Sequence, residues 1–237
     1  MILEYAILAL DIKSITVSSY GLREGIIYDT IQETDDIREY KHLAHLRYET
    51  IYSICNLYKA DLRHAEHVRN LALSIFDATQ TLHYLGNSER EALEAAALLH
   101  DIGYHISHDQ HHKHSYYLIN NCMMPGYTNN ESELIALIAR YHRKSHPKKK
   151  HPEFEHVSPE KQNIVRILAG ILRIAEGLDR RQTQLVESVK CKISENKIHI
   201  KIKLGDASLP ADIELWGANR RKSLIEEALG VAVEIGG

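Results

Sequence analysis

Cysteine is scarce in this chain. Its three cysteines, Cys55, Cys122 and Cys191, lie far apart and form no closely spaced pair. A disulfide framework or a thiolate zinc site requires recurrent, closely spaced cysteines. The sequence therefore predicts neither kind of site, and it favours a reducing compartment, the cytoplasm.

Long hydrophobic runs are also missing. A membrane-spanning helix needs roughly 20 consecutive apolar residues, and no segment approaches that length. The apolar start, Met1 to Leu10, is interrupted by Glu4, is followed by Asp11 and has no basic region, unlike a signal peptide. The hydrophobic share of 44% and the charged share of 26% are ordinary for globular proteins. We therefore expect a soluble folded protein that does not interact with a membrane.

Histidine, in contrast, is abundant. The chain has 16 histidines, and many of them gather between His100 and His114. Neutral imidazole is the commonest metal ligand near physiological pH, so this cluster indicates a metal site. The net charge of −3 conceals a basic run, Arg140 to Lys150, which has no acidic residue. Such a run is usually a solvated surface, but beside an active site it would attract phosphate.

Hydrophobic periodicity predicts a mainly α protein in three parts. Residues 1–35 read as a short helix followed by a strand at Ile15–Ser18. Residues 36–184 are almost wholly helical, and residues 185–237 alternate as a small α+β subdomain. In this last part we expect strands at 189–193, 198–202 and 212–216, a helix at 221–229 and a closing strand at 231–235.

Two helix starts carry clear signals. Ser88 with Glu91 has the spacing of a capping box and opens a helix that runs to His100. Ser158 followed by Pro159 is typical of the start of another helix.

Ionisable residues stand where these helices should present apolar side chains. His64 precedes Val68 by four, so the two share the inward face of one helix. His100 and Asp101 follow the apolar segment Ala95–Leu99 and end a buried helix.

The same pattern recurs later in the chain. His142 stands four residues beyond Ile138, and Glu176 and Asp179 continue the inward face of Leu172. A single inward histidine is commonly satisfied by a backbone carbonyl, and a single aspartate by a helix cap or an ion pair. Because a buried carboxylate is costly without compensation, four such groups on four helices favour one shared metal.

These residues also resemble a known family. The motifs DLRHAEHV, AALLHDIG, HKHSYYLI, RYHRK and ILRIAEGLDR occur in this order, and they are similar to the signature of the HD superfamily of metal-dependent phosphohydrolases. More narrowly, they resemble the C-terminal half of exopolyphosphatase/guanosine-pentaphosphatase (Ppx/GppA) proteins. Residues 1–35 resemble the end of their actin-like domain.

The resemblance implies an HD-type helical domain over residues 36–184. It also implies that actin-like exopolyphosphatase chemistry is absent, since the glycine-rich phosphate loops of that domain are missing. The chain has no Asp-Gly pair, and its only Gly-Gly pair is at its end.

The resemblance further implies a set of metal ligands, namely His64, His100, Asp101, His114, His142, and Glu176 or Asp179. His114 and His142 match the two extra histidines of HD enzymes with two metals. His111 and His112 are less favoured, because they precede the expected helix face of His114. For the last ligand, Glu176 is slightly favoured by register over Asp179.

We therefore expect one or two divalent ions, Mn²⁺, Fe²⁺, Mg²⁺ or Zn²⁺, since the ligands are imidazole and carboxylate without thiolate. His100 and Asp101 would be catalytic in hydrolysis of a small phosphate ester or nucleotide, with Asp101 bridging the ions. Arg143, Lys144 and Arg180 are the candidate phosphate-binding residues.

The alternative is a non-catalytic regulatory module that senses a nucleotide or polyphosphate. We expect no specific nucleic acid as a partner. A homodimer is predicted, because an isolated helix and strand at the N-terminus would expose a strand edge and apolar residues.

Overall fold

The computed structural model describes residues 2–12 and 39–236 of the chain. Residues 1–45 and residues 46–237 form two compact units. The first unit holds helix α1 (Ile2–Ala9), which confirms the predicted N-terminal helix, and the start of α3 (Glu39–Leu57). The predicted strand at 15–18 lies outside the described residues.

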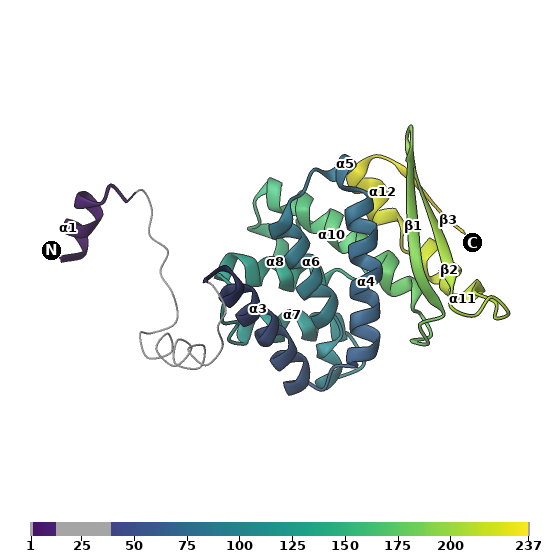
Figure 1. The fold of residues 1–237 in the computed structure, drawn as a ribbon, viewed down its shortest axis with the longest axis horizontal. Coiled ribbons are helices and arrows are strands. Elements are labelled where there is room, and N and C mark those ends of the chain that lie inside the picture. Colours follow the sequence, from purple (N-terminus) through teal and green to yellow (C-terminus); the bar gives the residue numbers. More distant parts are fainter. Residues whose placement is uncertain (1, 13–38, 237) are drawn as a thin grey trace. The chain divides into compact units, whose positions relative to one another are not determined.

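The second unit begins with a helical array (Figure 1). After the end of α3, its elements are α4 (Leu62–Ala78), α5 (Gln80–His83), α6 (Asn87–Leu99), the 3₁₀ helix η1 (Ile102–His105), α7 (His111–Asn121), α8 (Asn129–Arg140), α9 (Pro152–Glu155) and α10 (Pro159–Leu178).

Helix α10 is at the centre of this array. It packs against α4, α6 and α8 on the helical side and against α11 and α12 on the other. Almost all of its residues from Val165 to Leu178 are buried. Ser158 caps its first turn by accepting a hydrogen bond from the Lys161 amide at 3.3 Å, and Pro159 is its first residue. The predicted start of this helix is thus confirmed.

The chain ends in a small three-stranded sheet with two helices (Figure 1). The elements are β1 (Val186–Ser194), β2 (Lys197–Leu204), α11 (Asp212–Asn219), α12 (Ser223–Leu229) and β3 (Ala232–Gly236). β2 is the middle strand, antiparallel to β1 and parallel to β3. The mainly helical fold with a small α+β part is therefore confirmed.

The predicted strand at 212–216 is wrong, because these residues form helix α11. The alternation of apolar and acidic residues there suggested a strand. Instead, Glu214, Gly217 and Ala218 share one buried helix face with the spacing i, i+3, i+4. Arg181 neutralises the buried Glu214 carboxylate through two bonds of 2.6 and 2.7 Å.

The predicted capping box at Ser88 is also wrong. The N-cap of helix α6 is Gly86, two residues before Ser88, and the helix begins at Asn87. Glu89 accepts a hydrogen bond from the Gly86 amide at 2.9 Å. Glu91 points elsewhere and pairs with Arg47 at 2.6 Å. Glu89 follows Gly86 by three residues, and Glu91 follows Ser88 by three residues. Glycine and serine are both common at helix N-caps, so this spacing alone could not distinguish the two possible helix starts.

Among the described residues, no helix combines the length and the hydropathy needed to cross a bilayer.

Candidate metal centre

Two groups of potential metal ligands share Asp101. One group contains His64, His100 and Asp101, and the other contains Asp101, His111 and His142. The Asp101 carboxylate lies between them. Its Oδ2 is 3.4 Å from His100 Nε2 and 3.8 Å from His64 Nε2, and its Oδ1 is 3.2 Å from His111 Nε2 and 3.7 Å from His142 Nε2. Each oxygen of one carboxylate therefore faces two imidazoles.

His100 and His142 are held in the same way. Nδ1 of His100 donates to the carbonyl of Ala97 and Nδ1 of His142 donates to that of Ala139, both at 2.7 Å. Both side chains are fully buried, and burial lowers the pKa of each imidazole. The rings are thus neutral, with an unprotonated Nε2 directed at Asp101.

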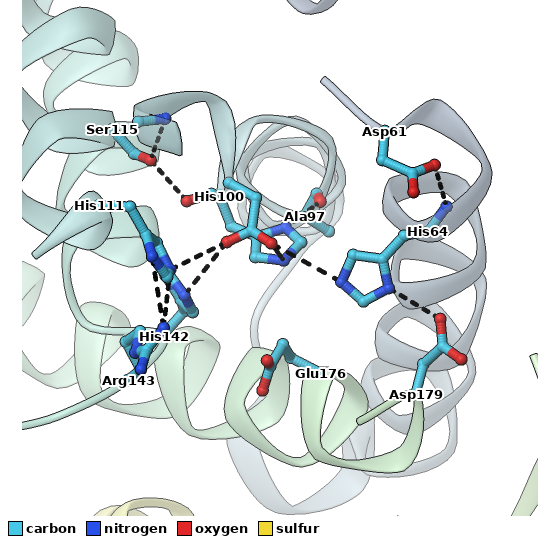
Figure 2. Close-up of polar contacts among 12 residues, drawn as sticks. Asp61, His64, Ala97, His100, His111, Ser115, His142, Arg143, Glu176 and Asp179 are labelled. Atoms are coloured by element: carbon cyan, nitrogen blue, oxygen red, sulfur yellow. Dashed lines mark hydrogen bonds and ion pairs between the residues drawn. The ribbon is translucent and has the colours of Figure 1, made fainter. Parts of the chain in front are cut away.

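His64 is fixed by a carboxylate instead of a carbonyl. It lies in the first turn of α4, and its Nδ1 is 2.8 Å from Oδ2 of Asp179 (Figure 2). The second oxygen of Asp179 accepts a bond from the Gln184 amide at 2.8 Å. Such carboxylate–histidine pairs orient a metal-binding ring and make it more basic. Asp179 thus contacts the centre through His64 and is not in either group of ligands.

His111, and not His114, completes the second group. The sequence favoured His114, but helix α7 begins at His111, whose side chain is buried against Asp101, while His114 is half-buried and belongs to neither group. His111 also contacts Arg143, whose Nη1 is 3.0 Å from its Nε2. The ring of Tyr104 lies against that of His111, with centroids 3.9 Å apart and the planes tilted by 35°.

A close approach of α7 makes this arrangement possible. A Cβ at Gly103 would lie 2.0 Å from the His111 carbonyl oxygen, so only glycine allows the contact. Ser115 stabilises this close approach, because its hydroxyl accepts a hydrogen bond from the Gly103 amide and donates one to the His100 carbonyl. The glycine of the HDIG motif thus brings His111 to Asp101.

The charge of Asp101 is stabilised by its neighbours. Burial alone would raise the pKa of this carboxyl, but His100, His111 and His142 hold it well below its usual value. Asp101 is therefore ionised.

Glu176 lies one helical turn before Asp179 on α10, and it too belongs to neither group of ligands (Figure 2). Its Oε2 is paired with the guanidinium of Arg221, which comes from the α+β part of the chain. Burial, with the nearby cations Arg143 and Arg173, lowers the pKa of Arg221 to about 10. Arg221 thus brings a positive charge to the centre, although it lies 120 residues after Asp101 in the sequence.

The three predicted phosphate-binding residues lie in three different surroundings. Arg143 lies at the centre, on His111. Arg180 is 4.0 Å from Glu176, and its side chain is 42% exposed. Lys144 lies on the lining of a different cavity, which contains neither Asp101 nor His64. The buried Arg173 holds this segment by donating to the carbonyls of Tyr141 and Lys144 at 3.0 and 2.9 Å.

A cavity of about 390 Å³ opens onto His64 and Asp101. Tyr58, Tyr104 and His108 supply aromatic walls, and its remaining lining is Lys59, Ala60, Asp61, Ala65, Leu98 and Gln182. Burial and the Asp101 carboxylate raise the pKa of Tyr104, whereas Arg143 and Arg180 oppose that rise. The cavity therefore joins aromatic surface to the Asp101 carboxylate, and Arg143 and Arg180 act on Tyr104 from outside its lining.

Comparison with known proteins supports the narrower resemblance, to Ppx/GppA proteins. A family model described as Ppx/GppA phosphatase, domain III, matches residues 46–227. Guanosine-5'-triphosphate,3'-diphosphate pyrophosphatase of Pseudoalteromonas atlantica is 31% identical over 194 residues, covering 79% of this chain and 36% of that protein. The protein of the same name from Aeromonas hydrophila subsp. hydrophila is 35% identical over 181 residues, covering 74% and 34%.

This chain thus spans about a third of the length of the curated relatives it matches. The family model covers most of the chain, from within α3 to α12. The chain belongs to the Ppx/GppA phosphatase domain III family.

Proposed function

We propose that the chain is an HD-type, metal-dependent phosphohydrolase that acts on a nucleotide or another small phosphate ester. His64, His100 and Asp101 would hold one divalent ion, and Asp101, His111 and His142 a second. The sharing of Asp101 between these two groups is the observation that carries the proposal.

The hydrogen-bonding roles at the centre call for a cation. Nε2 of His64, His100 and His142 and Oδ1 of Asp101 are buried without a hydrogen-bond partner among the described residues. In His100 and His142, Nδ1 carries the proton, so Nε2 is an acceptor that faces another acceptor. Burial opposes protonation of both rings. One metal ion in each group would give these acceptors a common partner.

The spacing of the donors fits the same interpretation. Ligands about 2.1 Å from one ion, at angles of 90–110°, lie about 3.0–3.4 Å apart. The four Asp101–imidazole distances of 3.2 to 3.8 Å are close to this range. Imidazole and carboxylate without thiolate suit Mn²⁺, Fe²⁺, Mg²⁺ or Zn²⁺.

Each protein group then has a separate task. Divalent ions, when bound, lower the pKa of water and neutralise charge on phosphate oxygens. Arg143 and Arg180 would bind the substrate phosphate beside them, and Arg221 adds positive charge opposite Asp101. Glu176 is a further buried carboxylate, paired with Arg221, and we propose it as a ligand that leaves Arg221 when an ion binds.

A nucleotide is the substrate that suits the cavity. Tyr58 and Tyr104 provide ring faces on which a base could stack, and the arginines beside Tyr104 suit its phosphates. The names of the relatives from P. atlantica and A. hydrophila describe action on a guanosine polyphosphate.

The test is a metal analysis combined with an activity screen. Protein purified without chelator should contain Mn, Fe or Zn, or should bind Mn²⁺ on titration. Phosphatase and phosphodiesterase activity supplemented with Mn²⁺ should fall about 1,000-fold or more in Asp101→Ala and in His100→Ala. Both variants should stay folded, because the buried alanine and leucine face of α6 is unchanged. Failure to bind any divalent ion, or full activity in Asp101→Ala, would refute the proposal.

A regulatory module is the second candidate. It is favoured by the fact that about two thirds of the length of the relatives lies outside the match. Metal and nucleotide binding without turnover of any substrate, lost together in Asp101→Ala, would support this candidate over the first.

A further inference from the structure

Three side chains outside the metal centre form a row of polar contacts from a serine through a histidine to a glutamate. Nε2 of His146 is 3.3 Å from the hydroxyl oxygen of Ser223, and Nδ1 of the same ring is 3.2 Å from a carboxylate oxygen of Glu227. His146 lies between α8 and α9, 77 and 81 residues before its two partners, which belong to α12. We call these three residues the Ser223 triad.

The hydrogen-bonding roles in the Ser223 triad follow from the carboxylate. An ionised carboxylate only accepts hydrogen bonds, so the proton of the imidazole belongs on Nδ1, which faces Glu227. Nε2 of His146 is then an acceptor for the Ser223 hydroxyl. Among the described residues, His146 is the one ion-pair partner of Glu227. A hydroxyl beside a histidine that a carboxylate orients is the arrangement that activates a nucleophile.

Helix α10 fixes the backbone on both sides of His146. Arg166 and Arg173 of α10 donate hydrogen bonds to the carbonyls of Pro147 and Lys144, each at 2.9 Å. These carbonyls lie one residue after and two residues before the histidine. The imidazole is therefore presented by a segment that the central helix holds in place.

Helix α12 is held by the same central helix. Ser223 and Glu227 are four residues apart on α12, so their side chains lie on one face of it. Ile225 packs closely on α10, since a Cβ at Gly170 would lie 2.8 Å from the Ile225 Cβ. Both halves of the Ser223 triad thus rest on one rigid support, as a preorganised catalytic group requires.

The sheet carries a second set with the same pattern of atoms. Ser194 Oγ is 2.9 Å from His199 Nε2, and His199 Nδ1 is 3.0 Å from Glu234. Lys197, however, pairs with Glu234 at 2.6 Å, and His199 is 41% exposed, compared with 23% for His146. A carboxylate that is already paired, beside an imidazole open to water, stabilises an imidazolium less. This set is therefore the comparison for the Ser223 triad.

We propose that Ser223 is a nucleophile that accepts acyl groups from carboxylic esters. Its oxygen attacks the ester carbonyl carbon while its proton passes to Nε2 of His146, and that proton then moves to the alcohol oxygen as the ester bond breaks. Water attacks the acyl-serine by the same route, which releases the carboxylic acid and restores the serine. Ser223 and His146 are the catalytic residues, and Glu227 is a positioning residue that orients the ring.

The experiment uses the full chain in the presence of a chelator, so that the metal centre does not contribute. A fluorophosphonate probe, which modifies activated serines, should label Ser223, as located by mass spectrometry of peptides. The protein should also hydrolyse p-nitrophenyl acetate. Ser223→Ala should lose both reactions, and His146→Ala should slow labelling roughly 100-fold, because the general base is removed.

Two variants test the positioning role of Glu227. Glu227→Gln keeps the length of the side chain but removes its charge, so labelling of Ser223 should slow about tenfold or more. Glu227→Asp keeps the charge and should retain more of the rate. A purely structural contact would not depend on the charge, so labelling of Glu227→Gln at the rate of the unchanged protein would contradict this role.

Ser194→Ala is the matched control, because it removes the serine of the comparison set on the sheet. It should leave both the labelling rate and ester hydrolysis unchanged. Labelling of Ser194 as fast as Ser223 would show ordinary surface reactivity and overturn the proposal. So would the absence of label on Ser223 at millimolar probe concentration. Melting temperatures of all variants verify that they are folded.

Discussion

Asp179 illustrates how a single residue can act on the centre through another. Its Oδ2 fixes His64 Nδ1 while its Oδ1 accepts from the Gln184 amide. An asparagine there would place an NH₂ group against one of these donors, so His64 would be turned or driven into the other tautomer. We predict that Asp179→Asn lowers Mn²⁺ affinity about 10- to 100-fold without unfolding the protein.

Titration calorimetry with Mn²⁺ measures this effect. Asp206→Asn is the control, because Asp206 is exposed and, among the described residues, its carboxylate accepts hydrogen bonds from Ser208 alone. Equal affinity in the two variants would show that Asp179 does not orient a ligand.

The Glu176–Arg221 pair gives a second prediction at this scale. Both side chains are largely buried, at 11% and 15% exposure. Removing one partner leaves a buried charge, so Arg221→Met should lower the free energy of unfolding by about 3 kcal/mol, and Glu176→Gln/Arg221→Met should recover most of it. Urea unfolding in chelator measures both values.

Lys203→Met serves as the reference for this pair. Lys203 and Glu187 form an ion pair at 2.7 Å in which both side chains are more than half exposed. Little change is expected there. If Arg221→Met is no more destabilising than Lys203→Met, the pair contributes nothing to stability.

Single residues also show what the sequence could reveal. His64, His100, Asp101 and His142 stood out because each lies in line with, or directly after, an apolar helical stripe. His111 did not, since the place where α7 begins depends on Gln110 adopting a left-handed backbone, and no local signal marks that. Arg221 could not be found at all, because its role arises only from the packing of the α+β part onto α10.

At the scale of elements, the contact of η1 with α7 determines the second group of ligands. The Cβ added by Gly103→Ala would overlap the His111 carbonyl oxygen and lie 2.5 Å from the Ser115 amide nitrogen. We predict that this variant loses about 3 kcal/mol of unfolding free energy and binds fewer Mn²⁺ ions, because α7 must move away with His111.

Gly205→Ala is the natural comparison for this change. The nearest atoms to its added Cβ lie at 3.9 and 4.0 Å, so no backbone must move. Unfolding curves that coincide for the two alanine variants would contradict the role given to Gly103.

Helix α11 shows why some elements could not be predicted. Its sequence alternates like a strand, and two of its apolar side chains, Ile213 and Trp216, are in fact exposed. The helix is favoured by contacts that are distant in sequence. Gly217 and Gly177 let α11 and α10 approach closely, and a Cβ at Gly217 would lie 2.6 Å from the Gly177 carbonyl oxygen. Such contacts override local patterns.

At the scale of the whole molecule, the predicted homodimer remains to be tested. Of the apolar N-terminal residues that suggested it, Ile12 is 38% exposed, and the others, Ile15, Val17, Ile26 and Ile27, lie outside the described residues. We predict that the intact chain is dimeric and that a chain starting at Asp36 is monomeric or less soluble. Light scattering on both decides this, and two equally soluble monomers would refute it. A heteromer with a separate actin-like protein is the alternative.

The meeting of four helical segments at Asp101 has a further consequence. The ligands come from different helices: His64 from α4, His100 and Asp101 from the residues after α6, His111 from α7, and His142 from the residues after α8. Ions bound in the two groups would therefore act as cross-links between these helices. Ligand binding to the native state alone adds about 2.7 kcal/mol of stability at 100 times the dissociation constant. Without bound metal, buried hydrogen-bond acceptors face one another where these helices meet. Local opening, and with it exchange of amide hydrogens with solvent, should therefore begin at these helix ends and depend on the free metal concentration.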